Sequence, residues 1–194
     1  MKVLITGSNG LLGQNLIHKI SRDKSIDLIA TSIGDNRVSE INGYNYFSLD
    51  ITNKKDVHNI IVHNKPDVVI NTAAMTNVDL CEIDKERCDS LNVKSVKYLA
   101  DSCLEINAHL IHISTDFVFD GFSGPYHEED NSNPLSYYGL SKLKSEKLLK
   151  EHKVNATVIR TMVLFGKGEN LSSNNLILWA KNALLLGGDL NIVD

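Results

Sequence analysis

A tyrosine and a lysine four positions apart are the residues of this sequence best suited to acid–base chemistry. They are Tyr138 and Lys142, in the stretch SYYGLSK. On a helix, side chains at i and i+4 share one face. An ammonium beside a phenol lowers the phenol pKa from about 10, so that the phenol can exchange a proton with a carbonyl or alcohol oxygen. Tyr137 has the same spacing to Ser141, which offers no cation, so Tyr138 is the better candidate.

This spacing also occurs on ordinary exposed basic helices, so a second feature has to support the interpretation. The stretch HLIHISTD ends an apolar run with Ser114, Thr115 and Asp116. In open parallel sheets, ligands bind outside the carboxyl ends of the strands. A hydroxyl at such a strand end could hold the oxygen that a phenol protonates.

Three glycines follow the first apolar run, in the stretch TGSNGLLG (6–13). Gly7 permits a tight turn, Gly10 lets the backbone approach a pyrophosphate, and Gly13 lets the following helix pack against the strand. The start of that helix offers free N–H groups and partial positive charge to the phosphate. The spacing is GxxGxxG, whereas most dehydrogenases have GxGxxG. The turn predicts a dinucleotide site; the alternative is a turn that serves chain geometry only.

The residues after the second expected strand leave the choice between NAD(H) and NADP(H) open. An acid at this place bonds the ribose diol of NAD, and Asp35 could do so. Ser32 and Arg37 could instead take a 2′-phosphate, and they favour NADP(H). Each of these residues also fits a solvated loop.

Short β-branched apolar runs alternate with helical patterns along the chain. The expected strands are 3–5, 27–31, 46–49, 67–71, 109–114 and 156–159, and the expected helices are 11–21, 54–63, 85–105, 136–151 and 176–186, followed by a brief apolar run at 190–193. Continuously apolar strands are typical of sheets covered on both faces. The alternation predicts an α/β fold: a doubly wound parallel Rossmann sheet with helices on both faces and right-handed crossovers. Residues 119–134 form a long loop, which we expect to be functional.

The composition excludes other classes of protein. Among 194 residues, 42% are apolar and 23% are charged, as in ordinary globular domains, and the net charge of −4 argues against a nucleic-acid partner. Three cysteines without a CxxC spacing predict buried or incidental thiols and no metal site. No stretch approaches the roughly 18 to 20 apolar residues of a membrane span, and the N-terminal apolar run is too short for a signal peptide. We therefore expect a cytoplasmic protein without a membrane partner.

Several longer stretches together resemble the extended short-chain dehydrogenases/reductases, and within them the dTDP-4-dehydrorhamnose reductase family. They are TGSNGLLG (6–13), INTAAMTNVDLCE (70–82), ISTDFVFDG (113–121), PYHEEDNSNPLSYYGLSKLKSE (125–146) and VIRTMVLFG (158–166), in family order over nearly the whole chain. The resemblance implies NAD(P)H-dependent reduction of the 4-keto group of a nucleotide-linked 6-deoxy sugar. The nucleotide sugar is the expected partner, and a homodimer is left open.

The resemblance also implies roles for individual residues. Thr115, Tyr138 and Lys142 would be catalytic: Tyr138 would protonate the sugar C4 oxygen, and Lys142 would also hold the nicotinamide ribose. With the residues chosen above, the expected cofactor-binding set is Gly7, Asn9, Gly10, Leu11, Leu12, Gly13, Ser32, Arg37, Asp50, Ile51, Asn71, Ala73, Ala74, Tyr138 and Lys142. The expected substrate-binding set is Thr76, Val78, Thr115, Asp116 and Phe117, with Met75 beside them. Arg160 fits either a place near the nicotinamide or a structural ion pair.

The same resemblance implies a domain division. Residues 1–165 would form the NAD(P)-binding Rossmann domain, and residues 166–194 would begin a substrate-binding region whose usual continuation is largely missing here. We therefore expect these residues alone to bind the cofactor and to turn over poorly.

Two other functions remain open. The first is a nucleotide-sugar epimerase or dehydratase, although a dehydratase would usually have an Asp-Glu pair where Asp116 and Phe117 follow Thr115. The second is a non-catalytic NADP-binding regulatory subunit, such as the methionine adenosyltransferase β subunit, which resembles the same family.

Overall fold

The fold is built on one parallel sheet of six strands. The computed structural model describes residues 1–38, 42–171 and 176–187. The strands are β1 (Lys2–Thr6), β2 (Asp27–Ser32), β3 (Tyr44–Ser48), β4 (Val68–Asn71), β5 (His109–Thr115) and β6 (Ala156–Thr161), in the order β3-β2-β1-β4-β5-β6. Every neighbouring pair is parallel. The strand order reverses between β1 and β4, which confirms the predicted doubly wound Rossmann sheet.

The helices follow the sequence prediction, with one irregular turn. They are α1 (Leu11–Ile20), α2 (Lys54–Asn64), α3 (Val78–Ile83), α4 (Lys85–Asp89), α5 (Ser95–Glu105), α6 (Tyr137–Glu151) and α7 (Leu176–Leu185), with a π-helical turn η1 (Ser90–Lys94) and a 3₁₀ turn η2 (Asp116–Val118). The predicted helix over 85–105 is confirmed as a continuous helical stretch, and η1 is a π-helical turn within it that the sequence does not predict. The expected run at 190–193 lies outside the described residues.

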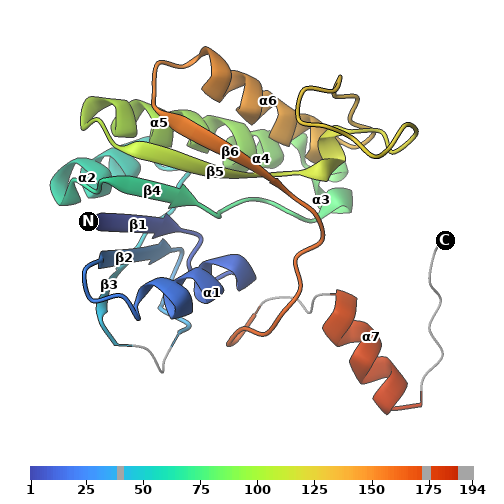
Figure 1. The fold of residues 1–194 in the computed structure, drawn as a ribbon, viewed down its shortest axis with the longest axis horizontal. Coiled ribbons are helices and arrows are strands. Elements are labelled where there is room, and N and C mark those ends of the chain that lie inside the picture. The colour runs from blue at the N-terminus through green and yellow to red at the C-terminus, as the bar shows by residue number, and fades with distance from the viewer. Residues whose placement is uncertain (39–41, 172–175, 188–194) are drawn as a thin grey trace.

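Two apolar clusters hold the layers together. Helices α2, α5 and α6 pack on one face of the sheet, where Leu4, Val69 and Leu110 meet Val57 and Leu99. Helix α1 packs on the other face, where Ile17 meets a separate cluster of strand residues. Figure 1 shows α5 and α6 in the upper part of the view and α1 in the lower part. Both clusters support the strand ends that carry the candidate site.

The far edge of the sheet is less covered than the sequence predicts. On β6, Ile159 is 43% exposed, so the expectation of a strand buried on both faces is wrong there. The segment that follows is also apolar and exposed, with Met162 at 75% and Phe165 at 70%. Helix α7 stands apart from the sheet (Figure 1). None of the helices in the described ranges is both long and apolar enough to cross a membrane.

Candidate active site

The turn between β1 and α1 has no room for side chains at two of its glycines. Gly7 has φ +70°, and a Cβ there would lie 2.6 Å from the backbone N of Ala73. A Cβ on Gly13 would lie 2.6 Å from the Cα of Ser8. Helix α1 starts without a side-chain cap and without an acid in its first turn, so its first N–H groups are open to an anion. The turn is therefore shaped as a cradle for phosphate.

We expect Gly13→Ala to destabilise the fold by about 1 to 3 kcal/mol, because the added methyl group overlaps main-chain atoms that cannot move independently. Gly10→Ala is the matched control, since a Cβ there meets only the carbonyl oxygen of Gly7, at 3.3 Å. Thermal unfolding of the two variants measures the difference. Equal melting temperatures would show that the close packing of Gly13 against the main chain of Ser8 does not contribute to stability.

Asn9 holds the loop that follows β2 against this turn. Its side-chain amide donates to the carbonyl of Asp35 at 2.9 Å and accepts from the backbone N–H of Arg37 at 3.0 Å. The guanidinium of Arg37 donates to the carbonyl of Asn170 at 3.1 Å. Ser32, at the end of β2, is half-buried. The Asn9 side chain therefore bonds other parts of the protein and fixes the loop after β2. In Rossmann folds, this loop is where the adenosine ribose of the dinucleotide is recognised.

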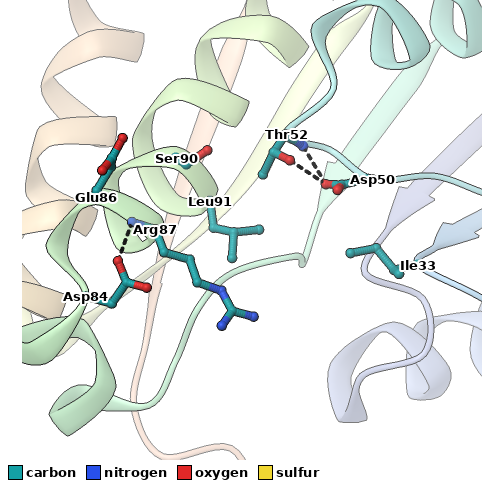
Figure 2. Close-up of a pocket in the computed structure, with 8 residues that line it drawn as sticks. All are labelled: Ile33, Asp50, Thr52, Asp84, Glu86, Arg87, Ser90 and Leu91. Atoms are coloured by element: carbon teal, nitrogen blue, oxygen red, sulfur yellow. Dashed lines mark hydrogen bonds between the residues drawn. The ribbon is translucent and has the colours of Figure 1, made fainter.

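A pocket of about 410 Å³ lies between this loop, the end of β3 and α4. Figure 2 shows Ile33 and Asp50 on one side of it and the Arg87 side chain projecting into it from the other. Asp50 accepts hydrogen bonds from the backbone N–H and hydroxyl of Thr52, at 2.9 and 2.7 Å. The expected cofactor residue Ile51 instead places its side chain in the core.

Sequence reasoning missed Arg87. Among the described residues its guanidinium has no hydrogen-bond or ion-pair partner, whereas its backbone N–H donates to the Asp84 carboxylate at 3.0 Å. The sequence pattern places Arg87 in the first turn of a long helix and carries no sign of the pocket. The pocket is built from segments far apart in the sequence, around Ile33, Asp50 and Arg87.

Thr115 and Tyr138 meet at the carboxyl end of β5. The Thr115 hydroxyl donates to Asp116 at 3.1 Å and accepts from the backbone N–H of Phe117 at 3.2 Å. Burial raises the pKa of Tyr138, and the nearby Thr115 side chain offsets part of that rise. The rings of Phe117 and Tyr138 pack edge to face at 5.9 Å. Gly139 makes this approach possible, because a Cβ there would overlap the carbonyl oxygen of Phe117.

Lys142 lies below this pair and points toward the sheet. It is 2% exposed, and its Nζ lies 3.1 Å from Nε2 of His112. Burial lowers the pKa of Lys142 to about 8, against smaller opposing effects of Glu146 and Cys88. The sequence prediction that Lys142 lowers the pKa of Tyr138 is wrong for this arrangement: the pKa of Tyr138 is raised, because desolvation dominates and the amine is turned toward His112.

The remaining expected residues lie around this edge of the sheet. Ala73 and Ala74 are half-buried in the loop after β4, and Val78 is half-buried at the start of α3. Met75 is buried and packs near Tyr138, whereas Thr76 is exposed. Asp116 and Phe117 form the turn η2 directly after Thr115. Of the expected substrate residues, Phe117 packs against Tyr138, and Asp116 accepts a hydrogen bond from Thr115.

Arg160 makes a structural ion pair. Its Nε and Nη2 donate to the two carboxylate oxygens of Glu146, at 3.0 and 2.7 Å. Ser114 also donates to Glu146, and the guanidinium of Arg160 lies 5.0 Å from the ring centre of Phe119. Of the two alternatives that the sequence left open for Arg160, these contacts favour the ion pair.

We expect the buried amine of Lys142 to make stability depend on pH. The folded protein releases this proton near pH 8 and the unfolded chain near 10.4, so the unfolded state binds more protons between those values. Stability should therefore rise with pH through this window, by at most about 3 kcal/mol. Denaturant unfolding at pH 7.5 to 9.5 measures this slope, and Lys142→Met should flatten it. An unchanged slope in the variant would contradict the assignment.

Taken together, a doubly wound sheet, a glycine turn before an uncapped helix, and a threonine–tyrosine pair with a lysine one helical turn further along α6 define the extended short-chain dehydrogenase/reductase class. Comparison with known proteins identifies the family within this class. Residues 1–186 match the model of the RmlD substrate binding domain, and the chain belongs to that family.

Three relatives illustrate the similarity. A dTDP-4-dehydrorhamnose reductase of Aggregatibacter actinomycetemcomitans is 38% identical over 96% of this chain and 59% of its own length. The bovine (Bos taurus) methionine adenosyltransferase 2 subunit beta is 35% identical over 89% of this chain and 50% of its own length. The structure of a dTDP-4-dehydrorhamnose reductase from Bacillus anthracis in complex with NADP has a TM-score of 0.75 and 29% identity, over 94% of this chain and 59% of that one. The chain thus spans about half to three-fifths of the length of these relatives.

Proposed function

We propose that the protein carrying this chain reduces the 4-keto group of a nucleotide-linked 6-deoxy sugar with NAD(P)H, as the dTDP-4-dehydrorhamnose reductases among its relatives are named for doing. The observation that carries the proposal is the meeting of the Tyr138 phenol and the Thr115 hydroxyl at the carboxyl edge of the sheet. Both lie on the edge that also carries the glycine turn. This is the combination that carbonyl reduction requires: a proton donor, an orienting hydroxyl and a dinucleotide cradle.

The residues present fit a dinucleotide. No side chain fits at Gly7 or Gly13, the first N–H groups of α1 are uncapped, and the buried Ser8 Oγ has no hydrogen-bond partner among the described residues. When bound, the reduced nicotinamide supplies the hydride. The related structure in complex with NADP supports NADP(H) for this chain, in agreement with the prediction from Ser32 and Arg37.

Each side chain then has a distinct task. The raised pKa of Tyr138 keeps its phenol protonated at neutral pH, ready to donate to the oxygen that becomes an alcohol. Thr115 can hydrogen-bond the same oxygen and so orient the carbonyl. Lys142, by turning from His112 toward the cleft, would bring a positive charge to the phenolate that remains.

The domain division belongs to the same proposal. Residues 1–165 would form the cofactor-binding domain, and residues 166–194 would begin the region that binds the sugar. We propose that the protein acts in the cytoplasm on a nucleotide sugar. Analytical ultracentrifugation tests the homodimer that the sequence leaves open.

A net-redox assay tests the function. The protein is incubated with dTDP-4-dehydrorhamnose and either NADPH or NADH, and cofactor oxidation is compared with sugar product. We expect one cofactor oxidised per sugar reduced, faster with NADPH. Product without net oxidation would identify an epimerase or dehydratase, and faster oxidation of NADH would refute the preference for NADP(H).

The relationship to the methionine adenosyltransferase subunit favours one second candidate, a cofactor-binding regulatory subunit. Such a protein would bind NADP(H) without consuming it and would copurify with a partner enzyme. Tight binding in calorimetry, with no oxidation in the assay above, would favour this candidate. The acid–base side chains Thr115 and Tyr138, placed together here, favour the reductase.

A further inference from the structure

A row of buried polar side chains crosses the sheet below the candidate site. Thr6, Asn71 and His112 are register partners on β1, β4 and β5, so they lie side by side. Lys142 and Ser145 of α6 meet the end of this row. All five residues are at most 2% exposed, so their polar atoms must find hydrogen-bond partners inside the protein. The directions of these bonds can therefore be worked out.

The orientation of the Asn71 amide is fixed by a main-chain donor. Its Oδ1 accepts from the hydroxyl of Thr6 at 2.7 Å and from the backbone N–H of Ala73 at 3.2 Å. Because a backbone N–H can only donate, the oxygen has to face it. The Nδ2 group of Asn71 therefore faces Nδ1 of His112, at 3.1 Å.

His112 then has only one tautomer that fits. Burial holds the pKa of His112 well below its usual range, and a charge on Lys142 lowers that pKa further, so the ring is neutral in either state of Lys142. Its Nδ1 accepts from Asn71, which places the proton on Nε2. The hydroxyl of Ser145 lies 3.0 Å from Nε2 and itself donates to the carbonyl of Lys142 at 2.7 Å, so it can accept this proton.

Lys142 consequently faces a donor. Its Nζ lies 3.1 Å from the same Nε2, and an ammonium cannot donate to a nitrogen that carries a hydrogen. The lone pair of a neutral amine could share this hydrogen with Ser145, so the position disfavours the ammonium. The titratable groups near the amine are His112 of β5, Glu146 on the same helix, itself paired with Arg160 of β6, and the buried thiol of Cys88 on α4.

We propose that Asn71, acting through the Nε2–H tautomer of His112, makes the resting position of Lys142 less favourable for the ammonium than a position turned toward Tyr138. Asn71 and His112 are then positioning residues for Lys142. The inference rests on the proposed function only in giving Lys142 a task at the site. The tautomer and the proton equilibrium are properties of the protein without cofactor or substrate.

Nitrogen-15 NMR of histidine-labelled protein tests the first step without any substitution. At neutral pH we expect the His112 ring to carry its proton on Nε2 and to leave Nδ1 bare. A proton on Nδ1, or an imidazolium, would overturn the proposal. The assay of NAD(P)H oxidation does not enter this measurement, so failure of the reductase function and failure of this inference are distinguishable.

Asn71→Asp tests the second step. Its carboxylate can still accept from Thr6 and Ala73, but it also accepts from Nδ1, so His112 should switch to the Nδ1–H tautomer and free Nε2 to accept from the ammonium. We expect the NMR titration midpoint of Lys142 to rise by one pH unit or more. Asn59→Asp, the same change at an exposed position of α2, should leave both signals unmoved. A retained Nε2–H tautomer, or equal midpoints in the two variants, would overturn the proposal.

Discussion

Replacing Tyr138 by phenylalanine is expected to lower the rate of keto-sugar reduction by roughly 10²- to 10⁴-fold, the usual contribution of a positioned proton donor. The ring would stay in place, because its packing against Phe117 and the Met75 cluster does not involve the hydroxyl. Dinucleotide affinity and melting temperature should therefore change little. The readouts are kcat for NAD(P)H oxidation and calorimetric binding, in the protein carrying this chain.

Tyr137→Phe is the matched control, because it removes the same atom from the neighbouring position. The Tyr137 hydroxyl donates to Asp89 at 2.9 Å and lies 3.2 Å from Lys144, outside the Thr115 contact. We expect kcat to fall by less than about threefold in this variant, since no proton donor is lost. Equal losses in the two variants would remove Tyr138 from the mechanism.

Arg160→Met is expected to cost about 2 to 4 kcal/mol of unfolding free energy, because it leaves the carboxylate of Glu146 without its cation. The side chain of Glu146 is only 10% exposed, so water cannot replace the two hydrogen bonds from the guanidinium. Urea unfolding measures the loss. Adding Glu146→Gln to Arg160→Met should recover part of the lost unfolding free energy, since the amide leaves no unpaired buried charge.

Lys97→Met provides the reference for that measurement. Lys97 pairs with Asp101 one helical turn away at 2.8 Å, but its side chain is 54% exposed. Exposed pairs contribute at most about 1 kcal/mol. If Arg160→Met costs no more than Lys97→Met, the pair between β6 and α6 does not anchor the end of the sheet.

Much of the fold could be predicted because local pattern and tertiary structure agree. The apolar runs around Ile5, Val69 and Leu110 became β1, β4 and β5, since each carries residues buried on the side of α2 and α5. The glycine turn was predictable for the same reason: the spacing of Gly7 and Gly13 reflects contacts with main chain close in space. Thr115 and Tyr138 meet because one ends a strand and the other begins the next helix.

What could not be predicted depends on contacts between distant segments. The π-helical turn η1 contains Asn92. Its side-chain oxygen accepts from the backbone N–H of Met75, and its amide nitrogen donates to the carbonyl of Met75 and to the hydroxyl of Ser141. A helical pattern over 85–105 contains no sign of these partners. The direction of the Lys142 side chain could not be predicted for the same reason. Its spacing to Tyr138 is compatible with a contact between the two, but the amine lies against His112 of β5. Arg87 reaches its pocket only through the same folding of separate segments.

The turn after β1 offers an anion main-chain N–H groups and no ionisable side chain, and this has a consequence for how the protein responds to acidity. Peptide N–H groups neither gain nor lose protons between pH 4 and 10, and α1 adds no ionisable side chain to its first turn. The grip on phosphate should thus stay constant while the states of Lys142 and His112 change. Main-chain N–H groups would bind the phosphate, whereas side chains would exchange protons. A change of pH can therefore alter proton exchange without weakening phosphate binding.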